Sequence, residues 1–191
     1  ITALLKKLGI YQNTLMFFTS DNGAAKRFDG IHNSSGVMQG KKRSLNEGGI
    51  RVPMVVRWPG KIKAGRVSSH PWYFPDVMPT FAEIGGVSTE VPEDIDGISI
   101  LPTLLDKGVQ KQHEYMFWQY GVRAVRSGKW KGIGKGGHLY LYDLSKDIEE
   151  KNDLSSKHPE IAARMKKYIT IGYREPRSQK DDGKYTGKDK K

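Results

Sequence analysis

Two adjacent polar residues follow an apolar run near the start of the chain. Residues 14–19 form an unbroken run rich in strand formers, and it ends at the turn Ser20-Asp21-Asn22-Gly23. Asp21 offers carboxylate oxygens and Asn22 an amide oxygen, which are the donors that Ca²⁺ or Mg²⁺ prefers. Ligands of open α/β sheets bind just beyond the carboxyl ends of strands. The position suits a cation site, but an Asp-Asn-Gly turn taken alone favours a β-turn or helix cap.

A basic cluster further along the chain is the second candidate for chemistry. Gly40-Lys41-Lys42-Arg43 leads through Glu47-Gly48-Gly49 to Arg51. A lysine beside a divalent cation can neutralise an anionic group during its transfer, acting as a point charge. The alternative is a solvated basic loop in which Glu47 and Arg51 pair structurally.

The five histidines lack the spacing of a zinc site. His32, between the two polar motifs, and His70, before an aromatic stretch, are candidates for substrate contact. For each of them the sequence favours an ordinary surface or packed histidine. The aromatic residues of Phe117-Trp118-Gln119-Tyr120 could stack on a sugar ring, but a place in a sheet core is favoured.

The composition of the chain indicates which classes of molecule it could bind. There are 32 Lys and Arg against 21 Asp and Glu, a formal charge of +11, and no cysteine. The charge favours polyanions such as nucleic acid, anionic membrane, or sulfated and phosphorylated substrates. Basic motifs interleaved with aromatics are absent, so nucleic acid is not predicted. No run approaches the roughly 20 apolar residues of a membrane-spanning helix, so no membrane span is predicted either.

The elements that would position the polar motifs are typical of an α/β fold. Residues 1–8 have helical spacing, and residues 14–19 and 54–58 predict strands buried on both faces in a parallel sheet. Residues 76–84 predict a helix, with apolar residues on one face. Because the chain opens without Met inside a helix, we expect its true amino terminus to lie upstream.

The second half of the chain has a different pattern. Four short strands at hairpin spacing predict an antiparallel sheet, and a helix follows at residues 159–169. The expected strands are residues 115–120, 122–126, 129–133 and 139–144.

Ordered motifs across residues 1–170 resemble the type I sulfatases, the arylsulfatase-like members of the alkaline-phosphatase superfamily. Each motif is modest, but the series is specific. The matching segments are Thr19-Ser20-Asp21-Asn22-Gly23, Glu47-Gly48-Gly49-Ile50-Arg51-Val52-Pro53, Arg57-Trp58-Pro59-Gly60-Lys61-Ile62, Asp76-Val77-Met78-Pro79-Thr80, Ala124-Val125-Arg126-Ser127-Gly128-Lys129-Trp130-Lys131 and Leu141-Tyr142-Asp143-Leu144.

The resemblance implies the carboxyl-terminal part of such an enzyme. Residues 1–86 would end an alkaline-phosphatase-like sandwich with a mostly parallel sheet and would carry the metal and sulfate-contact motifs. Residues 87–112 would connect it to a small α+β unit with an antiparallel sheet and final helix at 113–172. Residues 173–191 would form a basic polar tail.

The resemblance also implies residue roles. Asp21 and Asn22 would bind an active-site Ca²⁺, with Mg²⁺ as the alternative, and Lys42, five residues before Glu47, would contact the sulfate. Lys41 takes that role if the loop register differs. Asn46 stands where the family often has an aromatic residue, a departure that concerns packing more than chemistry.

The family's nucleophile has no counterpart in this chain. It is a formylglycine made from Cys or Ser in a Cys/Ser-x-Pro/Ala-x-Arg motif, and we expect it upstream, in a missing amino-terminal half, with the remaining metal ligands. We therefore expect a sulfuric ester hydrolase that is inactive as this chain alone and acts on a sulfated small molecule or sulfated glycan. The alternatives are a related phosphodiesterase or phosphonate hydrolase, and a non-catalytic module that binds sulfated polysaccharide. A periplasmic, secreted or lysosomal location is implied by the resemblance only.

Overall fold

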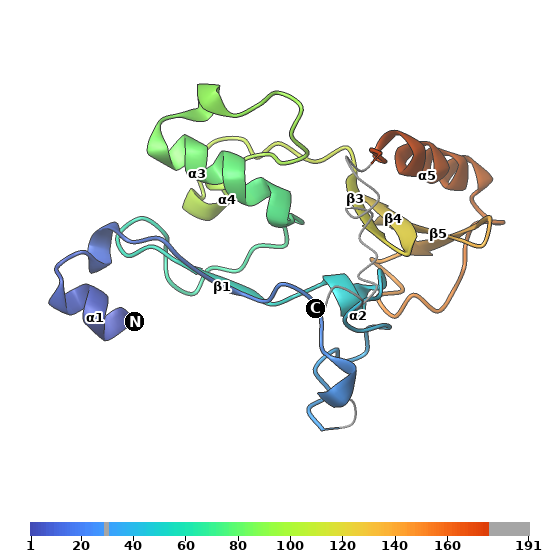
Figure 1. The fold of residues 1–191 in the computed structure, drawn as a ribbon, viewed down its shortest axis with the longest axis horizontal. Helices are drawn as coiled ribbons and strands as arrows, with labels where there is room; N and C mark the ends of the chain where they lie inside the picture. The colour runs from blue at the N-terminus through green and yellow to red at the C-terminus, as the bar shows by residue number, and fades with distance from the viewer. Residues whose placement is uncertain (29–30, 176–191) are drawn as a thin grey trace, which may run out of the picture. The chain divides into compact units, whose positions relative to one another are not determined.

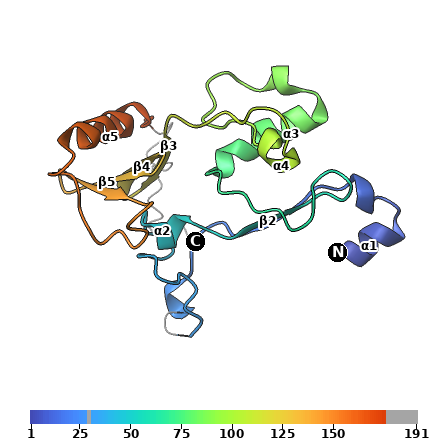
Figure 2. The same cartoon turned by 180° about the vertical axis from the view of Figure 1, so that it is seen from behind.

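The computed structural model describes residues 1–28 and 31–175, which divide into two compact units. The first unit contains residues 1–19 and 53–113, and the second contains residues 20–52 and the chain from Glu114 onwards (Figures 1 and 2). The chain therefore leaves the first unit after Thr19 and returns to it at Pro53. Most of the expected basic tail, residues 176–191, lies outside the described residues.

The two strands of the first unit are antiparallel. β1 (Met16–Thr19) pairs with β2 (Met54–Arg57), with Phe17 opposite Val56. Phe18 is 71% exposed and Val55 61% exposed. The prediction of parallel strands buried on both faces is thus wrong, and the parallel sandwich is absent from the described residues. An apolar run indicates that a strand has apolar faces, but not which strand pairs with it or in which direction.

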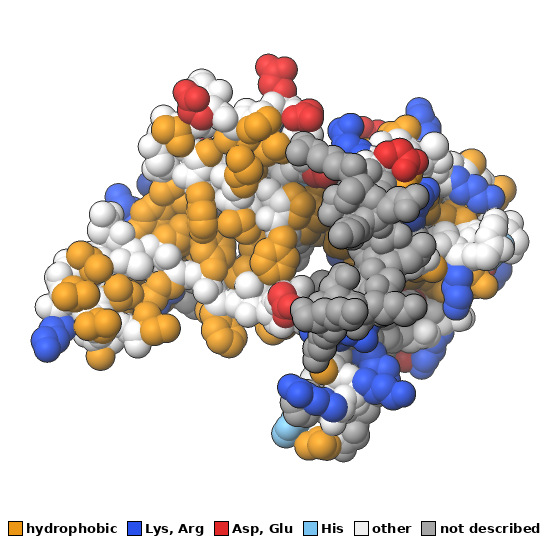
Figure 3. All heavy atoms as spheres, in the orientation of Figure 1, with side chains coloured by type: hydrophobic (Ala, Val, Ile, Leu, Met, Phe, Trp, Pro, Cys, Tyr) orange, Lys and Arg blue, Asp and Glu red, His pale blue; other side chains and the backbone are white. Residues whose placement is uncertain are grey.

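Three short α-helices complete the first unit. α1 (Thr2–Lys7) and α3 (Val77–Gly85) confirm the predicted helices, and α4 (Leu101–Leu105) follows them. The buried carboxylate of Asp76, just before α3, accepts the N–H groups of Tyr73 and Ile98 and lies 2.8 Å from His113 Nε2. Hydrophobic side chains gather on the face of this unit shown in Figure 3. None of the helices in the described ranges, 1–28 and 31–175, is long and apolar enough to cross a membrane.

The second unit is built on a four-stranded antiparallel sheet, as predicted. Its strands β3 (Met116–Tyr120), β4 (Val122–Ser127), β5 (Trp130–Lys135) and β6 (His138–Asp143) lie side by side in chain order. The hairpin connections use glycines, and Gly121 and Gly128 have φ of 66° and 55°. Glycine adopts these left-handed conformations without the strain that a Cβ would cause.

Each face of this sheet packs against a different part of the chain. On one face α5 (Pro159–Ile171) contributes Met165 to a cluster with Val125 and Leu141. On the other face Leu45, from the loop before α2 (Glu47–Ile50), packs against Ala124. Phe117 packs against the first cluster, and Trp118 and Tyr120 pack against the second, so these partly buried aromatic residues belong to the packing of the sheet as expected. The basic loop is therefore anchored to the sheet by an apolar side chain.

Candidate functional site

Backbone hydrogen bonds hold the two polar motifs of the second unit side by side. The N–H of Gly23 donates to the carbonyl of Gly49 at 2.9 Å, and the N–H of Lys42 donates to the carbonyl of Ala24 at 2.8 Å. The hydroxyl of Ser20 donates to the carbonyl of Asn22 at 2.9 Å and shapes the turn. The turn that carries Asp21 and Asn22 thus lies directly against the loop that carries the lysines.

Glycines make this close approach sterically feasible. A Cβ added to Gly23 would lie 1.9 Å from the carbonyl oxygen of Gly48. A Cβ added to Gly48 would lie 2.5 Å from the carbonyl oxygens of both Gln39 and Gly40. Both contacts are far below van der Waals separation, and the obstructing atoms are backbone. Gly23 therefore permits the turn to approach the loop, and Gly48 permits the loop to close on its own first residues.

The chemical groups of the two motifs lie at the surface of the unit. Asp21 and Lys42 are exposed, whereas Asn22 and Lys41 are half-buried. The next residue, Arg43, has a left-handed φ of 77°, which is uncommon for a residue other than glycine. The loop thus turns sharply just after Lys42. A carboxylate, an amide and an ammonium group on adjacent segments can bind an anion together with a cation.

A buried ion cluster, which the sequence did not predict, lies between the sheet and the loop that carries the lysines. Lys131 in β5 is fully buried, with Nζ 2.8 Å from Glu47 Oε1 and 2.9 Å from Glu150 Oε1. The ammonium group of Lys131 thus forms an ion pair with each of the two carboxylates. Arg51 Nη1 lies 3.4 Å from Glu47 Oε2, which confirms the pairing expected of a structural basic loop.

The pKa values of two ionisable groups near this cluster are shifted by burial. Burial, reinforced by the charge of Glu150, raises the pKa of Tyr142 to about 12. Burial also lowers the pKa of Arg126, an effect that the carboxylate of Glu47 opposes. Both shifts disfavour charge, as expected where little water reaches the ionised groups. The only local signal in the sequence was Lys131 itself, a lysine among the apolar residues of a strand.

The two candidate histidines lie in different units. His32 is exposed in the loop between the two motifs of the second unit. His70 belongs to the first unit, where it lines a cavity of about 190 Å³ with Trp72 and Arg66. Its Nδ1 lies 3.4 Å from Gln112 Nε2, its Nε2 is buried without a partner, and burial lowers its pKa. Substrate contact by either histidine stays a prediction.

The donor set at Asp21 and Asn22 suits a hard cation but is incomplete. Carboxylate and amide oxygens are the right type for Ca²⁺, which takes six to eight oxygen ligands. Across the described ranges, 1–28 and 31–175, no three His, Asp or Glu side chains gather in a way that could hold a metal ion. These two residues therefore fit a share of a Ca²⁺ site rather than a whole one.

Comparisons with known proteins place the chain in a family. The family described as "N-sulphoglucosamine sulphohydrolase, C-terminal" matches residues 39–173. Steryl-sulfatase of Mus musculus is 40% identical over 146 residues, covering 70% of this chain and 23% of that protein. N-acetylgalactosamine-6-O-sulfatase of Bacteroides thetaiotaomicron is 32% identical over 196 residues, covering 86% of this chain and 37% of that protein. The chain thus spans less than half the length of these relatives.

Solved structures agree with the sequence matches. A protein solved in work on glycosaminoglycan metabolism by Bacteroides thetaiotaomicron superposes with a TM-score of 0.75 at 30% identity, covering 90% of this chain and 41% of that one. Ps i-CgsB in complex with k-i-k-neocarrahexaose gives 0.74 at 31% identity, covering 90% and 39%. The chain therefore belongs to the N-sulphoglucosamine sulphohydrolase C-terminal family and is the carboxyl-terminal part of a type I sulfatase.

Proposed function

We propose that this chain supplies part of the cation site and the sulfate contact of a sulfatase, a sulfuric ester hydrolase that acts as the full-length protein. One observation carries the proposal, namely the pair of backbone hydrogen bonds that place the Lys42 loop against the Asp21-Asn22 turn. A cation bound at the turn and an ammonium group from the loop can therefore reach the same anion.

Each group has a distinct part in the proposed reaction. Asp21 and Asn22 hold the cation, Ca²⁺ or else Mg²⁺, which when bound draws electron density from the sulfate oxygens. Lys42 contacts the sulfate and stabilises the negative charge that develops on the leaving oxygen. Lys41 takes this part if the register differs, and His32 and His70 are proposed as substrate contacts. None of these residues is proposed to attack sulfur. The family resemblance implies a formylglycine nucleophile in the amino-terminal half, and we expect this chain alone to be inactive.

Sulfated glycans and sulfated small molecules are the proposed substrate classes. The names of relatives support both, since one is a steryl-sulfatase and another an N-acetylgalactosamine-6-O-sulfatase. An assay of the full-length protein with a steryl sulfate, an aryl sulfate and a 6-sulfated N-acetylgalactosamine separates the classes. Turnover of none of the three would refute both substrate classes.

A periplasmic, secreted or lysosomal location is proposed from the family resemblance alone. Cell fractionation that follows the full-length protein with an antibody tests it. Recovery of the protein only in the cytosolic fraction would contradict the proposal.

The decisive experiment compares ester types. Purified full-length protein is expected to hydrolyse a chromogenic sulfate ester, and to lose that activity when a chelator removes the cation. Faster hydrolysis of a phosphate diester or phosphonate monoester would favour the related phosphodiesterases instead. Binding of sulfated polysaccharide without turnover of any ester would indicate a non-catalytic module.

A further inference from the structure

Glu150 holds both ends of the segment that carries the candidate lysines, residues 39–48, which we call the lysine loop. Its backbone carbonyl accepts a hydrogen bond from Gln39 Nε2 at 3.1 Å, and its carboxylate Oε2 accepts the N–H of Glu47 at 2.7 Å. The N–H of Gly48 donates to the carbonyl of Gln39 at 2.7 Å and closes the base of the loop. Any shift of this base therefore breaks a contact with Glu150.

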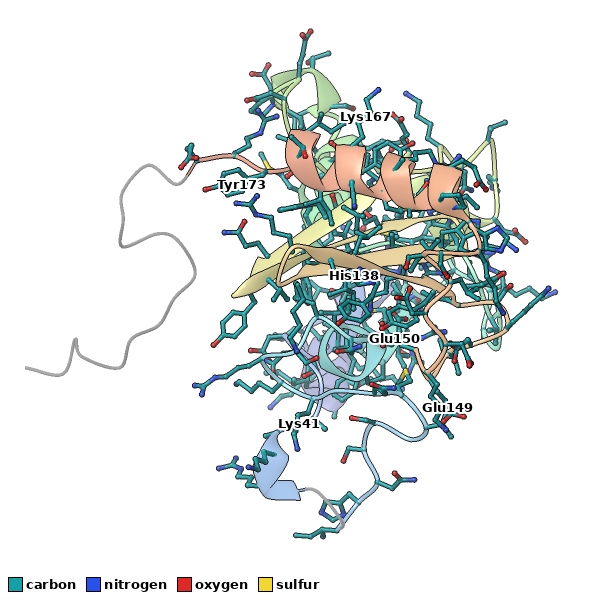
Figure 4. The ribbon with its side chains drawn as sticks, turned by 90° about the vertical axis from the view of Figure 1, so that its right-hand side faces the viewer. Lys41, His138, Glu149, Glu150, Lys167 and Tyr173 are labelled. Carbon is teal, nitrogen blue, oxygen red and sulfur yellow. The ribbon has the colours of Figure 1, made fainter. Side chains whose placement is uncertain are left out.

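The charge of this carboxylate is balanced from the sheet. Glu150 and Glu47 are both buried, and the single ammonium group of Lys131 lies between them. Arg51, which is half-exposed, lies against Glu47 and adds a second positive charge to the cluster. Figure 4 shows Glu150 below the sheet and close to α2. The neighbouring Glu149 lies farther from the sheet, on the loop between β6 and α5.

The conformation of Glu150 is itself unusual. Its φ is 53°, in the left-handed region that residues other than glycine seldom adopt. Such a conformation persists only where the surroundings determine it, and here the contacts with Gln39, Glu47 and Lys131 do so. Glu150 is thus held in one position by the groups that it in turn holds.

A buried ion cluster of this kind is a poor source of stability. Desolvating the charges offsets their attraction, and apolar residues of similar volume often stabilise a fold as well or better. A role in selecting one arrangement of the chain is the better-attested use of such clusters. In this unit the contacts of the cluster run to the two ends of the lysine loop.

We propose that Glu150 is a positioning residue for catalysis, which fixes the lysine loop and through it the Lys42 ammonium group at the sulfate. The proposal rests on the proposed sulfatase function. Gln39 and Lys131 act with Glu150, and none of the three touches substrate. The small carboxyl-terminal sheet would then be part of the catalytic apparatus, because it supplies the support on which the sulfate contact rests.

The test is a set of double-mutant cycles in the full-length enzyme. Glu150→Gln, Gln39→Ala and the control Glu149→Gln are each made in the wild type and in Lys42→Ala, and kcat, KM and Tm are measured. Glu150→Gln is expected to lower kcat roughly 10- to 100-fold in the wild type, because a small misplacement of a catalytic group has effects of this size. It should cause little further loss in Lys42→Ala, since it acts through that residue. Glu149→Gln should change kcat in neither background.

Gln39→Ala keeps the test decisive if Glu150→Gln fails to fold. Gln39 is exposed, so its truncation removes one contact with Glu150 without opening the core. A smaller loss of kcat is expected, again only where Lys42 is present. Equal losses in both backgrounds, or a fall in Tm with unchanged kcat, would overturn the positioning role while leaving the sulfatase function intact. If neither Lys42→Ala nor Lys41→Ala lowers kcat, the proposed function fails at this loop.

Discussion

The carboxylate of Glu150 accepts the backbone N–H of Glu47 at 2.7 Å, across a separation of 103 residues in the sequence. This hydrogen bond joins the first residue of α2 to the turn that follows the small sheet. Lys131 contacts both carboxylates from β5. The lysine loop and the sheet are thus held together by these contacts. A substitution in one is expected to change the conformation of the other.

Removal of the buried ammonium group is expected to destabilise the protein. Lys131→Met leaves two buried carboxylates without their shared partner, and breaking a buried ion pair from one side typically costs about 3–5 kcal/mol. Denaturant unfolding of the full-length protein measures the change. Lys151→Met, at an exposed ion pair with Glu149, is the matched control and should leave stability unchanged. Equal stability of the Lys131→Met and control variants would contradict the assigned role of the cluster.

The two adjacent lysines are expected to differ in their effect on catalysis. Lys42→Ala should lower kcat by roughly 10²–10³-fold, because it removes a charge whose contact strengthens as the leaving oxygen becomes negative. Lys41→Ala should have a far smaller effect. The measurement is kcat and KM for a chromogenic sulfate ester. A larger loss of kcat in Lys41→Ala than in Lys42→Ala would show that the sulfate contact is assigned one residue too far along the chain. Normal kcat in both variants would refute the lysine role that the family resemblance implies.

Loss of the Asp21 carboxylate is expected to weaken cation binding before it affects chemistry. Asp21→Ala should raise the Ca²⁺ concentration for half-maximal activity by at least roughly tenfold, the lower end of what even outer-shell changes cause. Excess Ca²⁺ should restore part of the activity. Titration of activity against Ca²⁺ checks this, with the exposed Asp94→Ala as control. An unchanged Ca²⁺ profile for Asp21→Ala would remove this residue from the metal site.

Acid is expected to weaken the second unit through Asp143. Burial pushes the pKa of this carboxyl up, but hydrogen bonds from Lys129 and Ser145 outweigh it, and the pKa falls from 3.8 to about 2. A folded pKa below the unfolded value means that the stability is fully present above pH 3.8 and is lost as the pH falls through about 2.

The difference in Tm between the wild type and Asp143→Asn measures this contribution. It should be largest near neutral pH and should shrink as the pH approaches 2. Asp94→Asn, at an exposed position, serves as the control. A difference that does not vary with pH would assign the effect of Asp143→Asn to shape rather than to charge.

The exposed apolar side chains of β1 and β2 are expected to limit the solubility of the isolated chain. Phe18 and Val55 are largely exposed and lie on paired strands (Figure 3 shows the apolar surface of this unit). Exposed apolar surface of this kind marks an interaction site or an aggregation risk. Light scattering and binding of a hydrophobic dye should report aggregation, and Phe18→Ser with Val55→Ser should reduce it. A monodisperse monomer that melts cooperatively and binds no dye would contradict this expectation.

Much of the local structure could be predicted from residue patterns. The helices α1, α3 and α5 follow from apolar spacing, and Gly86, which has a φ of 73°, caps the end of α3. The four strands of the second unit follow from short apolar runs separated by glycine turns. These features depend on residues that are neighbours in the chain, so the sequence displays them directly.

The amino-acid sequence alone showed that an Asp-Asn turn and a pair of lysines stand at the candidate site, and the family resemblance suggested their roles. Only the tertiary structure decided that β1 pairs with β2 in the antiparallel sense, and that residues 20–52 fold with the carboxyl-terminal sheet. It also decided that Lys131 is buried, because the carboxylate that accepts its hydrogen bond lies 84 residues away on Glu47. Whether a strand lysine faces water or two carboxylates depends on what packs against the strand, and no local pattern of residues carries that information.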